Sequence, residues 1–159
     1  MDNNLEKLNT YTLNEVTSSN RDSLISIREE VDGEDREKLE REAVKYTEVD
    51  GRKAFIIKDG DRVIGYVEID FGEEFPLGTP GDTIDATKFA HLARIGRSSD
   101  YKDQGIGQKL LQQAEEWAKS NGKTGMWLDY LADNIGAVKL YQTAGYEDIA
   151  EFKDIKKIS

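Results

Sequence analysis

The chain has 159 residues, of which 37% are hydrophobic and 34% charged, and its formal net charge is −10, so we expect one globular domain over 1–159. It contains no cysteine and one histidine, which excludes disulfides and thiolate nucleophiles and gives no reason to expect a metal site. The negative charge disfavours nucleic acid and favours cationic small molecules or peptides as partners. Since neither a membrane-spanning apolar run nor a signal peptide is visible, we expect a cytoplasmic protein with no membrane partner.

The first half of the chain predicts a short strand, two helices and then a hairpin. The expected strands are 8–13, 53–58 and 62–71, and the expected helices are 16–30 and 34–47. Asp59-Gly60 joins the last two strands, and this dipeptide readily adopts the positive φ that a tight turn requires. Acidic residues are concentrated over 15–50, and we interpret them as solvated helix faces.

The second half alternates strands with helices. The expected strands are 88–97, 125–131 and 146–152, and the expected helices are 106–119 and 134–144. Gly122 and Gly145 follow the two helices and are expected to end them. Adjacent strands at the start, followed by strand–helix–strand units, predict an α/β (α+β) fold with helices packed on a mixed sheet.

A loop with two glycines, 98–107, leads into the first helix of the second half. The first N–H groups of a helix have no partner within it, and together with the positive end of the helix dipole they attract anions. Gly105 and Gly107 have no Cβ, so we expect a phosphate group to approach the backbone closely there, near the positive charges of Lys102 and Lys109. An ordinary turn that uses glycine is the alternative.

Two other phosphate-binding motifs do not fit this region. A dinucleotide-binding GxGxxG needs a third glycine at the position of Leu110. A P-loop needs a glycine five residues before the triplet Gly122-Lys123-Thr124, where Trp117 stands. Both motifs are therefore excluded.

The loop fits a different pattern, [Q/R]-x-x-G-x-[G/A]. The matching residues are Lys102, Asp103, Gln104, Gly105, Ile106 and Gly107. With them, residues 91–146 resemble the core of the GCN5-related N-acetyltransferases (GNAT), which transfer the acyl group of acetyl-CoA to an amine and wrap the CoA diphosphate in this loop. Lys102 departs from the usual Arg or Gln and lacks the planar group that holds a phosphate in two places. The resemblance implies the GNAT fold, a mixed, mostly antiparallel central sheet of six or seven strands flanked by about four helices.

A second motif lies in the helix 134–144, where Asn134 and Tyr141 are two helical turns apart and so share a face. It is similar to the Asn-x₆-Tyr helix of the same family. The resemblance implies that Asn134 contacts the cofactor arm and that Tyr141 donates a proton to the departing CoA thiolate. A phenol of pKa near 10 and a thiol of pKa near 8.5 differ by about 1.5 units, so the transfer costs about 2 kcal/mol. The alternatives are a helix N-cap for Asn134 and a core position for Tyr141.

An amine acceptor must lose a proton before it attacks a thioester, because only about 10⁻³ of a lysine-like amine is neutral at pH 7. His91 is the only histidine, and its ordinary pKa near 6.5 suits a base. The resemblance implies a base at or near this position in some family members. Glu68 and Asp70, acting through water, are the alternative bases.

Strand alternation predicts that four residues share one side of their strand, namely His91, Ala93, Ile95 and Arg97. Ile95 and Arg97 are expected to bind the cofactor, and the resemblance implies that the Arg97 backbone N–H donates to the thioester carbonyl. The guanidinium of Arg97 is expected to pair with Asp100, and contact with a CoA phosphate or with an acidic acceptor is the alternative.

The sequence therefore predicts an N-acetyltransferase that transfers the acetyl group of acetyl-CoA to a primary amine of a small molecule or peptide by direct attack, with no metal. Acidic residues over 68–85 are expected to attract a cationic acceptor. A non-catalytic acyl-CoA-binding regulatory module and a structural domain are the alternatives. The acceptor, the acyl group and the oligomeric state stay open, although homodimers are common in the family.

Overall fold

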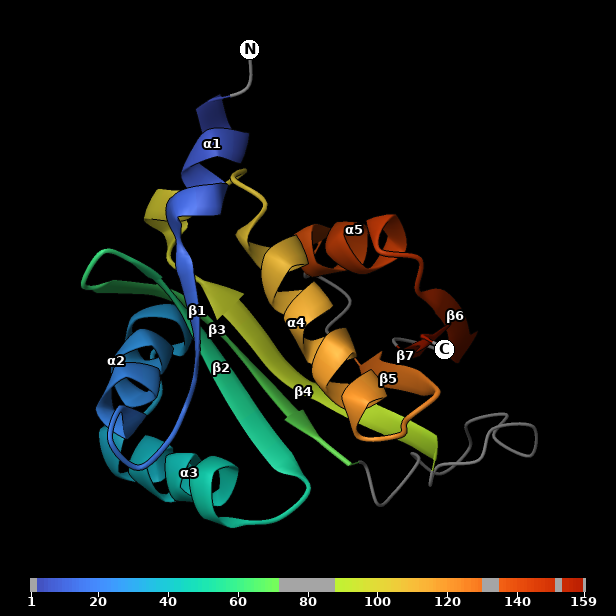
Figure 1. Cartoon of the computed structure of the whole chain (residues 1–159), viewed down its shortest axis with the longest axis horizontal. Coiled ribbons are helices and arrows are strands. Elements are labelled where there is room, and N and C mark those ends of the chain that lie inside the picture. Colours follow the sequence, from blue (N-terminus) through green and yellow to red (C-terminus); the bar gives the residue numbers. More distant parts are fainter. Residues whose placement is uncertain (1–2, 72–87, 130–134, 151–152, 159) are drawn as a thin grey trace.

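The computed structural model describes residues 3–71, 88–129, 135–150 and 153–158. The helices are α1 (Asn3–Thr10), α2 (Arg21–Asp32), α3 (Arg36–Glu48), α4 (Ile106–Ser120) and α5 (Ile135–Thr143). The strands are β1 (Thr12–Glu15), β2 (Arg52–Asp59), β3 (Arg62–Asp70), β4 (Phe89–Arg97), β5 (Gly125–Asp129), β6 (Glu147–Ala150) and β7 (Lys153–Lys157). They form one seven-stranded sheet in the order β1-β2-β3-β4-β5-β7-β6, in which β4 and β5 are parallel and the other neighbours antiparallel (Figure 1). The expected mixed, mostly antiparallel sheet flanked by helices is confirmed.

Helices cover both faces of the sheet, with α2 and α3 on one face and α4 on the other (Figure 1). In β2, Phe55 and Ile57 pack in the cluster under α4, whereas Ala54 and Ile56 pack in the cluster under α2 and α3. Successive side chains of a strand point to opposite faces, so this unbroken apolar run fits a strand buried on both sides. We call the two sides the α4 face and the α2–α3 face. Of the helices that the structure describes, none has the length and apolar character needed to cross a bilayer.

The N-terminal region differs from the expected strand and helix. Residues 3–10 form α1, so residues 8–10 of the strand expected at 8–13 are helical, and the strand found, β1, comprises Thr12–Glu15. Helix α2 begins later than expected, at Arg21, because the Asn20 side chain accepts a hydrogen bond from the Thr17 N–H at 2.7 Å and closes a turn. Such bonds between side chain and backbone offer the chain an alternative to the helix.

At the C-terminal end, one boundary agrees with the sequence and one strand is additional. Gly145, with a φ of +93°, follows α5 and ends it, as expected. Strand β6 lies within the expected strand 146–152, but residues 153–157 add β7, which pairs with both β5 and β6. Its sequence, KDIKK, is highly charged, and only its pairing with distant residues makes it a strand.

A β-bulge in the middle of β4 shapes the sheet near the expected site. The register with β3 shifts between Glu68 and Ile69, so Ala93 is an extra residue in β4. A bulge shifts the alternation of side chains. Ala93 contacts the cluster of the α2–α3 face, and Ile95 contacts that of the α4 face. The expectation that Ala93 and Ile95 share one side of the strand is therefore wrong.

Beyond the bulge, one edge of β4 has no described strand beside it. The parallel pairing of β4 with β5 ends at Leu92. The Ser98 N–H donates to Ile64 O at the start of β3, at 2.8 Å, and N–H groups of successive strand residues point to opposite edges. The N–H groups of Arg97 and Ile95 therefore point to the edge that β5 no longer covers. We call it the open edge of β4.

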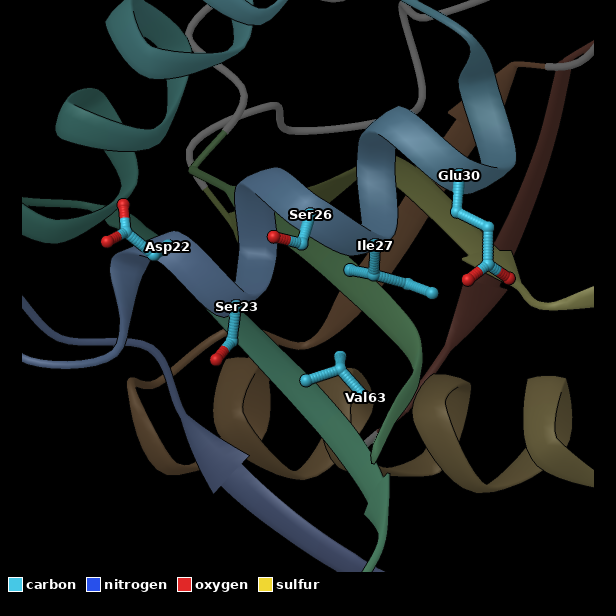
Figure 2. A pocket seen from close by; sticks show the side chains of 6 residues that line it. All are labelled: Asp22, Ser23, Ser26, Ile27, Glu30 and Val63. Atoms are coloured by element: carbon cyan, nitrogen blue, oxygen red, sulfur yellow. The ribbon is translucent and has the colours of Figure 1, made fainter. Parts of the chain in front are cut away.

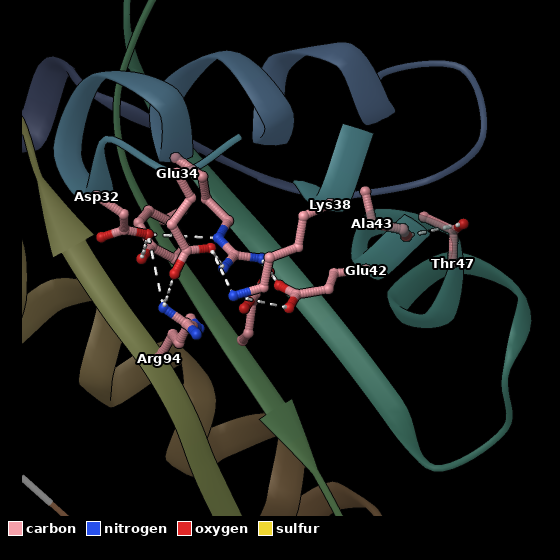
Figure 3. A network of polar contacts seen from close by, with 10 residues as sticks. Asp32, Glu34, Lys38, Glu42, Ala43, Thr47 and Arg94 are labelled. Carbon is pink, nitrogen blue, oxygen red and sulfur yellow. Dashed lines mark hydrogen bonds and ion pairs between the residues drawn. The ribbon is translucent and has the colours of Figure 1, made fainter. Parts of the chain in front are cut away.

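A buried arginine connects the helices of the α2–α3 face to the sheet. The side chain of Arg28 is 1% exposed and contacts four carboxylates at 2.6–3.4 Å, which belong to Asp32, Glu34, Glu42 and Glu68 (Figure 3). These come from the end of α2, the loop after it, α3 and β3. Buried charges are retained when they are paired in this way. The interpretation of the acidic residues of 15–50 as solvated helix faces is therefore wrong for Asp32, Glu34 and Glu42, whose side chains are 19–25% exposed.

Candidate functional site

The loop before α4 has a left-handed backbone at two positions. Ser99–Tyr101 form a short 3₁₀ helix, and Asp103 and Gly105 follow with φ of +61° and +79°. Asp is one of the few non-glycine residues that adopt this conformation readily. Turns that contain left-handed residues direct backbone N–H groups to one side and build anion-binding concavities.

Helix α4 begins at Ile106, and its first turn has no side-chain cap in the part of the chain that the structure describes. The Lys109 N–H donates to Gly105 O at 3.1 Å. The N–H groups of Ile106, Gly107 and Gln108 precede this bond, so the helix itself offers them no acceptor. Together with the helix dipole they form the positive end that the sequence predicts.

The two glycines of the loop allow close packing of other helices. A Cβ at Gly105 would lie 3.3 Å from Leu8 Cδ2 of α1, and a Cβ at Gly107 would lie 3.1 Å from Leu140 Cδ2 of α5. The positive φ at Gly105 also favours glycine. The sequence predicts that a phosphate approaches where the Cβ atoms are missing. In the structure, side chains of α1 and α5 pack in those two positions against the start of α4.

The polar side chains around the loop differ in their surroundings. Lys102 is exposed. Gln104 accepts a hydrogen bond through Oε1 from the Tyr11 hydroxyl, at 2.7 Å. Lys109 donates to the carbonyl oxygens of Leu8 and Tyr11, at 3.0 and 3.3 Å, and so contacts the end of α1. Lys102 is therefore the more accessible of the two cations expected near a phosphate.

The side chain of Arg97 has a partner other than the one expected. Its Nη1 donates to Ser98 O at 3.4 Å. Asp100 pairs with Arg62 of β3, whose Nη2 lies 2.8 Å from the Asp100 carboxylate. The expected pairing of Arg97 with Asp100 is thus replaced by Arg62–Asp100. The Arg97 N–H points toward the open edge of β4, so it is free of the β3 pairing, as donation to a thioester carbonyl would require.

Tyr141 lies on α5, next to Leu140, the residue that packs against Gly107. It is 5% exposed and belongs to the cluster of the α4 face. The structure thus joins α5 to the start of α4 and places Tyr141 one residue from that contact. Asn134 and the acidic stretch 72–85 lie outside the described residues.

His91 is held between two carboxylates from the strands on either side. Its Nδ1 lies 3.3 Å from Asp70 Oδ1 of β3, and its Nε2 lies 3.7 Å from Asp129 Oδ1 at the end of β5. Its ring stacks on Trp127, with the centroids 4.0 Å apart. Burial lowers the pKa of His91, but the contacts with Asp129 and Asp70 raise it more, to about 9. His91 therefore carries a proton at pH 7, in contrast to the expected pKa near 6.5.

The raised pKa of His91 predicts that the protein loses stability as the pH rises from about 6.5 to about 9. In this range the folded state keeps a proton that the unfolded chain, with a pKa of 6.5, releases. The stabilisation is complete below pH 6.5 and is lost as the pH passes about 9, a difference of about 3 kcal/mol. Urea unfolding at about pH 6 and about pH 9.5 measures it. His91→Gln is expected to lack this slope, and a slope that persists in the variant would contradict the assignment.

Glu68 and Asp70, the alternative bases, are both engaged with cations. Glu68 is 1% exposed, and its Oε2 lies 3.2 Å from Nη1 of Arg28. Burial raises the pKa of Glu68 to about 7, although Arg28 and Arg94 lower it. Asp70 contacts His91, and the side chains of this pair are 20% and 19% exposed. The pKa of Glu68 is thus closer to neutrality than that of His91, whereas the side chains of His91 and Asp70 are more accessible than that of Glu68.

Two hollows in the described surface are lined by residues outside the loop 102–107. One, of about 260 Å³, lies beside α2 and is lined by Asp22, Ser23, Ser26, Ile27, Glu30 and Val63 (Figure 2). Val63 contacts the cluster of the α2–α3 face, opposite the face on which α4 packs. The other, of about 270 Å³, is lined by residues of α4, the end of α5 and β7. Neither hollow includes residues 102–107.

Two features near the site are not indicated by the sequence. Tyr11 and Gln104 are 93 residues apart, and no local pattern joins them. For Arg28, the i,i+4 spacing to Asp32 is a signal for an ion pair on a helix surface, but not for the burial of the arginine.

Comparison with known proteins gives one family. Residues 15–146 match the model of the Acetyltransferase (GNAT) family. The uncharacterized N-acetyltransferase YobR of Bacillus subtilis is 32% identical over 63 residues, which cover 40% of this chain and 26% of that protein. The [ribosomal protein bS18]-alanine N-acetyltransferase of Escherichia coli (strain K12) is 26% identical over 96 residues, which cover 60% of this chain and 63% of that enzyme. The chain thus spans less than two thirds of the length of these curated relatives.

The fold is also shared with solved structures. AAC(6')-Iy in complex with the bisubstrate analog CoA-S-monomethyl-acetylneamine superimposes with a TM-score of 0.79 at 15% sequence identity, over 89% of this chain and 93% of that chain. The family match runs from Glu15, the last residue of β1, to Tyr146, which follows Gly145 at the end of α5. It therefore includes β2 to β5 and helices α2 to α5. The chain therefore belongs to the GNAT family of acetyltransferases.

Proposed function

We propose that the protein is an N-acetyltransferase that moves the acetyl group of acetyl-CoA to a primary amine. One observation carries the proposal: two sets of backbone donors lie at the same end of the sheet. The first is the uncapped first turn of α4, and the second is the N–H groups of Ile95 and Arg97 on the open edge of β4. A diphosphate anion fits the first set, and a thioester carbonyl fits the second.

The charges of this region support the binding of CoA. In a chain of net charge −10, an anion needs a local positive site. The first turn of α4 supplies one, and the exposed Lys102 adds a full charge. A structure with the same fold contains a bisubstrate CoA analog, which agrees with acetyl-CoA as the co-substrate.

The proposed chemistry uses three residues of the chain. When bound, acetyl-CoA supplies an activated acetyl group and a thiolate leaving group. The amine nitrogen forms a C–N bond to the acetyl carbon while the C–S bond breaks, and the Arg97 N–H stabilises the charge that develops on the carbonyl oxygen. His91 takes a proton from the ammonium, and Tyr141 gives one to the thiolate sulfur. The nitrogen loses a second proton as the amide forms, which returns Tyr141 to its neutral form, and the proton held by His91 is released to solvent, one per turnover.

Proton removal by His91 predicts that kcat/KM rises with pH up to about 9. With a pKa of about 9, about 1% of His91 is neutral at pH 7, and this fraction grows about tenfold per pH unit. The ratio of kcat/KM between the wild type and His91→Gln is therefore expected to rise about 50-fold between pH 7 and pH 9. Measuring both proteins with one acceptor cancels the titration of the acceptor. A ratio that stays constant, as a base other than His91 would give, excludes His91 as the base.

We propose a cationic primary amine of a small molecule or peptide as the acceptor. The carboxylates of Asp70 and Asp129 beside His91 and the net charge of −10 both attract a cation. The relatives agree with an amine, since one acts on an alanine of a ribosomal protein and the complex of another holds an analog that joins CoA to acetylneamine.

A two-step experiment tests the function. Calorimetric titration with CoA measures binding, and thiol release from acetyl-CoA is then followed with a panel of cationic primary amines, including aminoglycosides and peptides with a free N-terminus. We expect CoA to bind and at least one amine to release thiol. Binding with no thiol release from any amine would favour a non-catalytic CoA-binding module. No binding at millimolar CoA would overturn the proposal altogether.

A further inference from the structure

We infer that the N-terminal segment 3–11, which comprises α1 and Tyr11, is part of the CoA site, because it holds the loop before α4 in the conformation that binds the diphosphate. Tyr11 is the positioning residue. The inference rests on the proposed binding of CoA and adds a component to it. The family match begins at residue 15, so this segment lies outside the residues that the family model matches.

Tyr11 contacts the loop through both its hydroxyl and its ring. The hydroxyl donates to Gln104 Oε1 at 2.7 Å. The ring meets that of Tyr101 edge to face, with the centroids 5.8 Å apart. Tyr11 is only 6% exposed and belongs to the cluster of the α4 face. Packing in the core therefore restricts the position of the Tyr11 side chain, and its contacts with Gln104 and Tyr101 restrict the conformation of the loop.

The end of α1 contacts the residues that begin α4 (Figure 1). Leu8 Cδ2 lies 3.3 Å from the position of a Cβ on Gly105, so the absence of a side chain there lets α1 pack directly on the backbone. Lys109 Nζ donates to Leu8 O and Tyr11 O, at 3.0 and 3.3 Å. Carbonyl oxygens at the end of a helix carry its negative pole. The ammonium of Lys109 thus offsets a negative charge that would otherwise lie beside an anion site.

The loop needs such support because its backbone is not the one a free chain prefers. Asp103 and Gly105 both have positive φ, a conformation that Asp adopts more readily than most residues but that a free chain populates less than the right-handed and extended ones. Without contacts from elsewhere, the loop would populate other conformations, and its N–H groups would not converge. The bond from Tyr11 also uses the oxygen of the Gln104 amide, which leaves the NH₂ group, a donor, on the side away from Tyr11.

Two tyrosine variants of the full chain test the inference. Tyr11→Phe keeps the ring in the core and removes the hydroxyl that holds Gln104. Tyr66→Phe is the matched control, because Tyr66 is 1% exposed in the cluster of the α2–α3 face and its hydroxyl donates to Asp32 Oδ2 at 2.7 Å, away from the loop before α4. Both are compared with the wild type by amide hydrogen exchange of residues 102–110 in the free protein. Calorimetry then gives the dissociation constants of CoA and of pantetheine, which lacks the diphosphate.

For Tyr11→Phe we expect faster exchange over 102–110 and about fivefold weaker binding of CoA, the loss of one hydrogen bond of about 1 kcal/mol. Binding of pantetheine is expected to stay within twofold of the wild type. Tyr66→Phe is expected to leave all three quantities unchanged.

Three results would overturn the inference. They are an unchanged exchange rate in Tyr11→Phe, an affinity for CoA within twofold of the wild type, and an equal loss for CoA and pantetheine, which would mean that Tyr11 acts on the fold and not on the diphosphate loop. A wild type that binds no CoA would instead refute the proposed function, and the exchange rates would then still decide whether Tyr11 orders the loop.

Discussion

Replacing Tyr141 by Phe is expected to lower kcat about 10³-fold, within the range that a general acid contributes, and to leave the dissociation constant of CoA unchanged. The physical reason is that only the hydroxyl is removed. The ring, which is 5% exposed in the cluster of the α4 face, keeps its packing. Without a proton donor, the thiolate must leave as an anion in a largely apolar environment. Steady-state kinetics and calorimetry on the same preparation measure the two quantities.

Tyr146→Phe is the matched control for this prediction. The ring of Tyr146 lies 6.0 Å from that of Tyr141, and its hydroxyl donates to Glu115 at 3.0 Å. Its loss is expected to cost about 1 kcal/mol of stability and to change kcat by less than about twofold. If Tyr141→Phe retained wild-type kcat, or if both variants lost it equally, Tyr141 would be a core residue and not the acid.

Replacing Arg28 by Met is expected to lower the free energy of unfolding by about 3–5 kcal/mol. Methionine fills a similar volume but leaves Glu68, which is 1% exposed, without the cation that lies 3.2 Å from it. It also leaves three more carboxylates close together on the α2–α3 face, at Asp32, Glu34 and Glu42. Like charges that lose their shared partner repel one another. Urea unfolding at pH 7 gives the difference from the wild type.

Arg36→Met is the control. It shows how much stability is lost when an exposed arginine of α2 or α3 is removed instead of the buried Arg28. Arg36 lies at the start of α3 and pairs with Glu29 and Glu40, but its side chain is 47% exposed. Surface ion pairs of this kind contribute about 0–1 kcal/mol. If Arg28→Met cost no more than Arg36→Met, the buried network would not connect the helices to the sheet in the way described.

Local features of the fold and of the loop could be predicted from the sequence. The hairpin between β2 and β3 turns at Gly60, with a φ of +60°, and α5 ends before Gly145, because in both cases glycine supplies a conformation that other residues avoid. The start of α4 after Gly105 could also be predicted, because the helical spacing of apolar residues begins at Ile106, directly after this glycine.

Features that depend on distant contacts could not be predicted. The bulge at Ala93 exists only in the register of β4 with β3, and it moves Ile95 to the face opposite the one expected. Strand β7 has a sequence typical of a charged surface segment and becomes a strand by pairing with β5. The pKa of His91 is set by Asp70 and Asp129, which are 21 and 38 positions away along the chain. The sequence contains these residues, but it does not show that Asp70 and Asp129 lie close to His91 in space.

A crystal structure with CoA bound would show whether the first turn of α4 binds the diphosphate of the co-substrate. We expect diphosphate oxygens at about 3 Å from the backbone nitrogens of Ile106, Gly107 or Gln108. We also expect the thiol end of CoA along the open edge of β4, beside Ile95 and Arg97. A CoA molecule whose diphosphate lies elsewhere on the protein would contradict the assignment of the diphosphate to this helix turn.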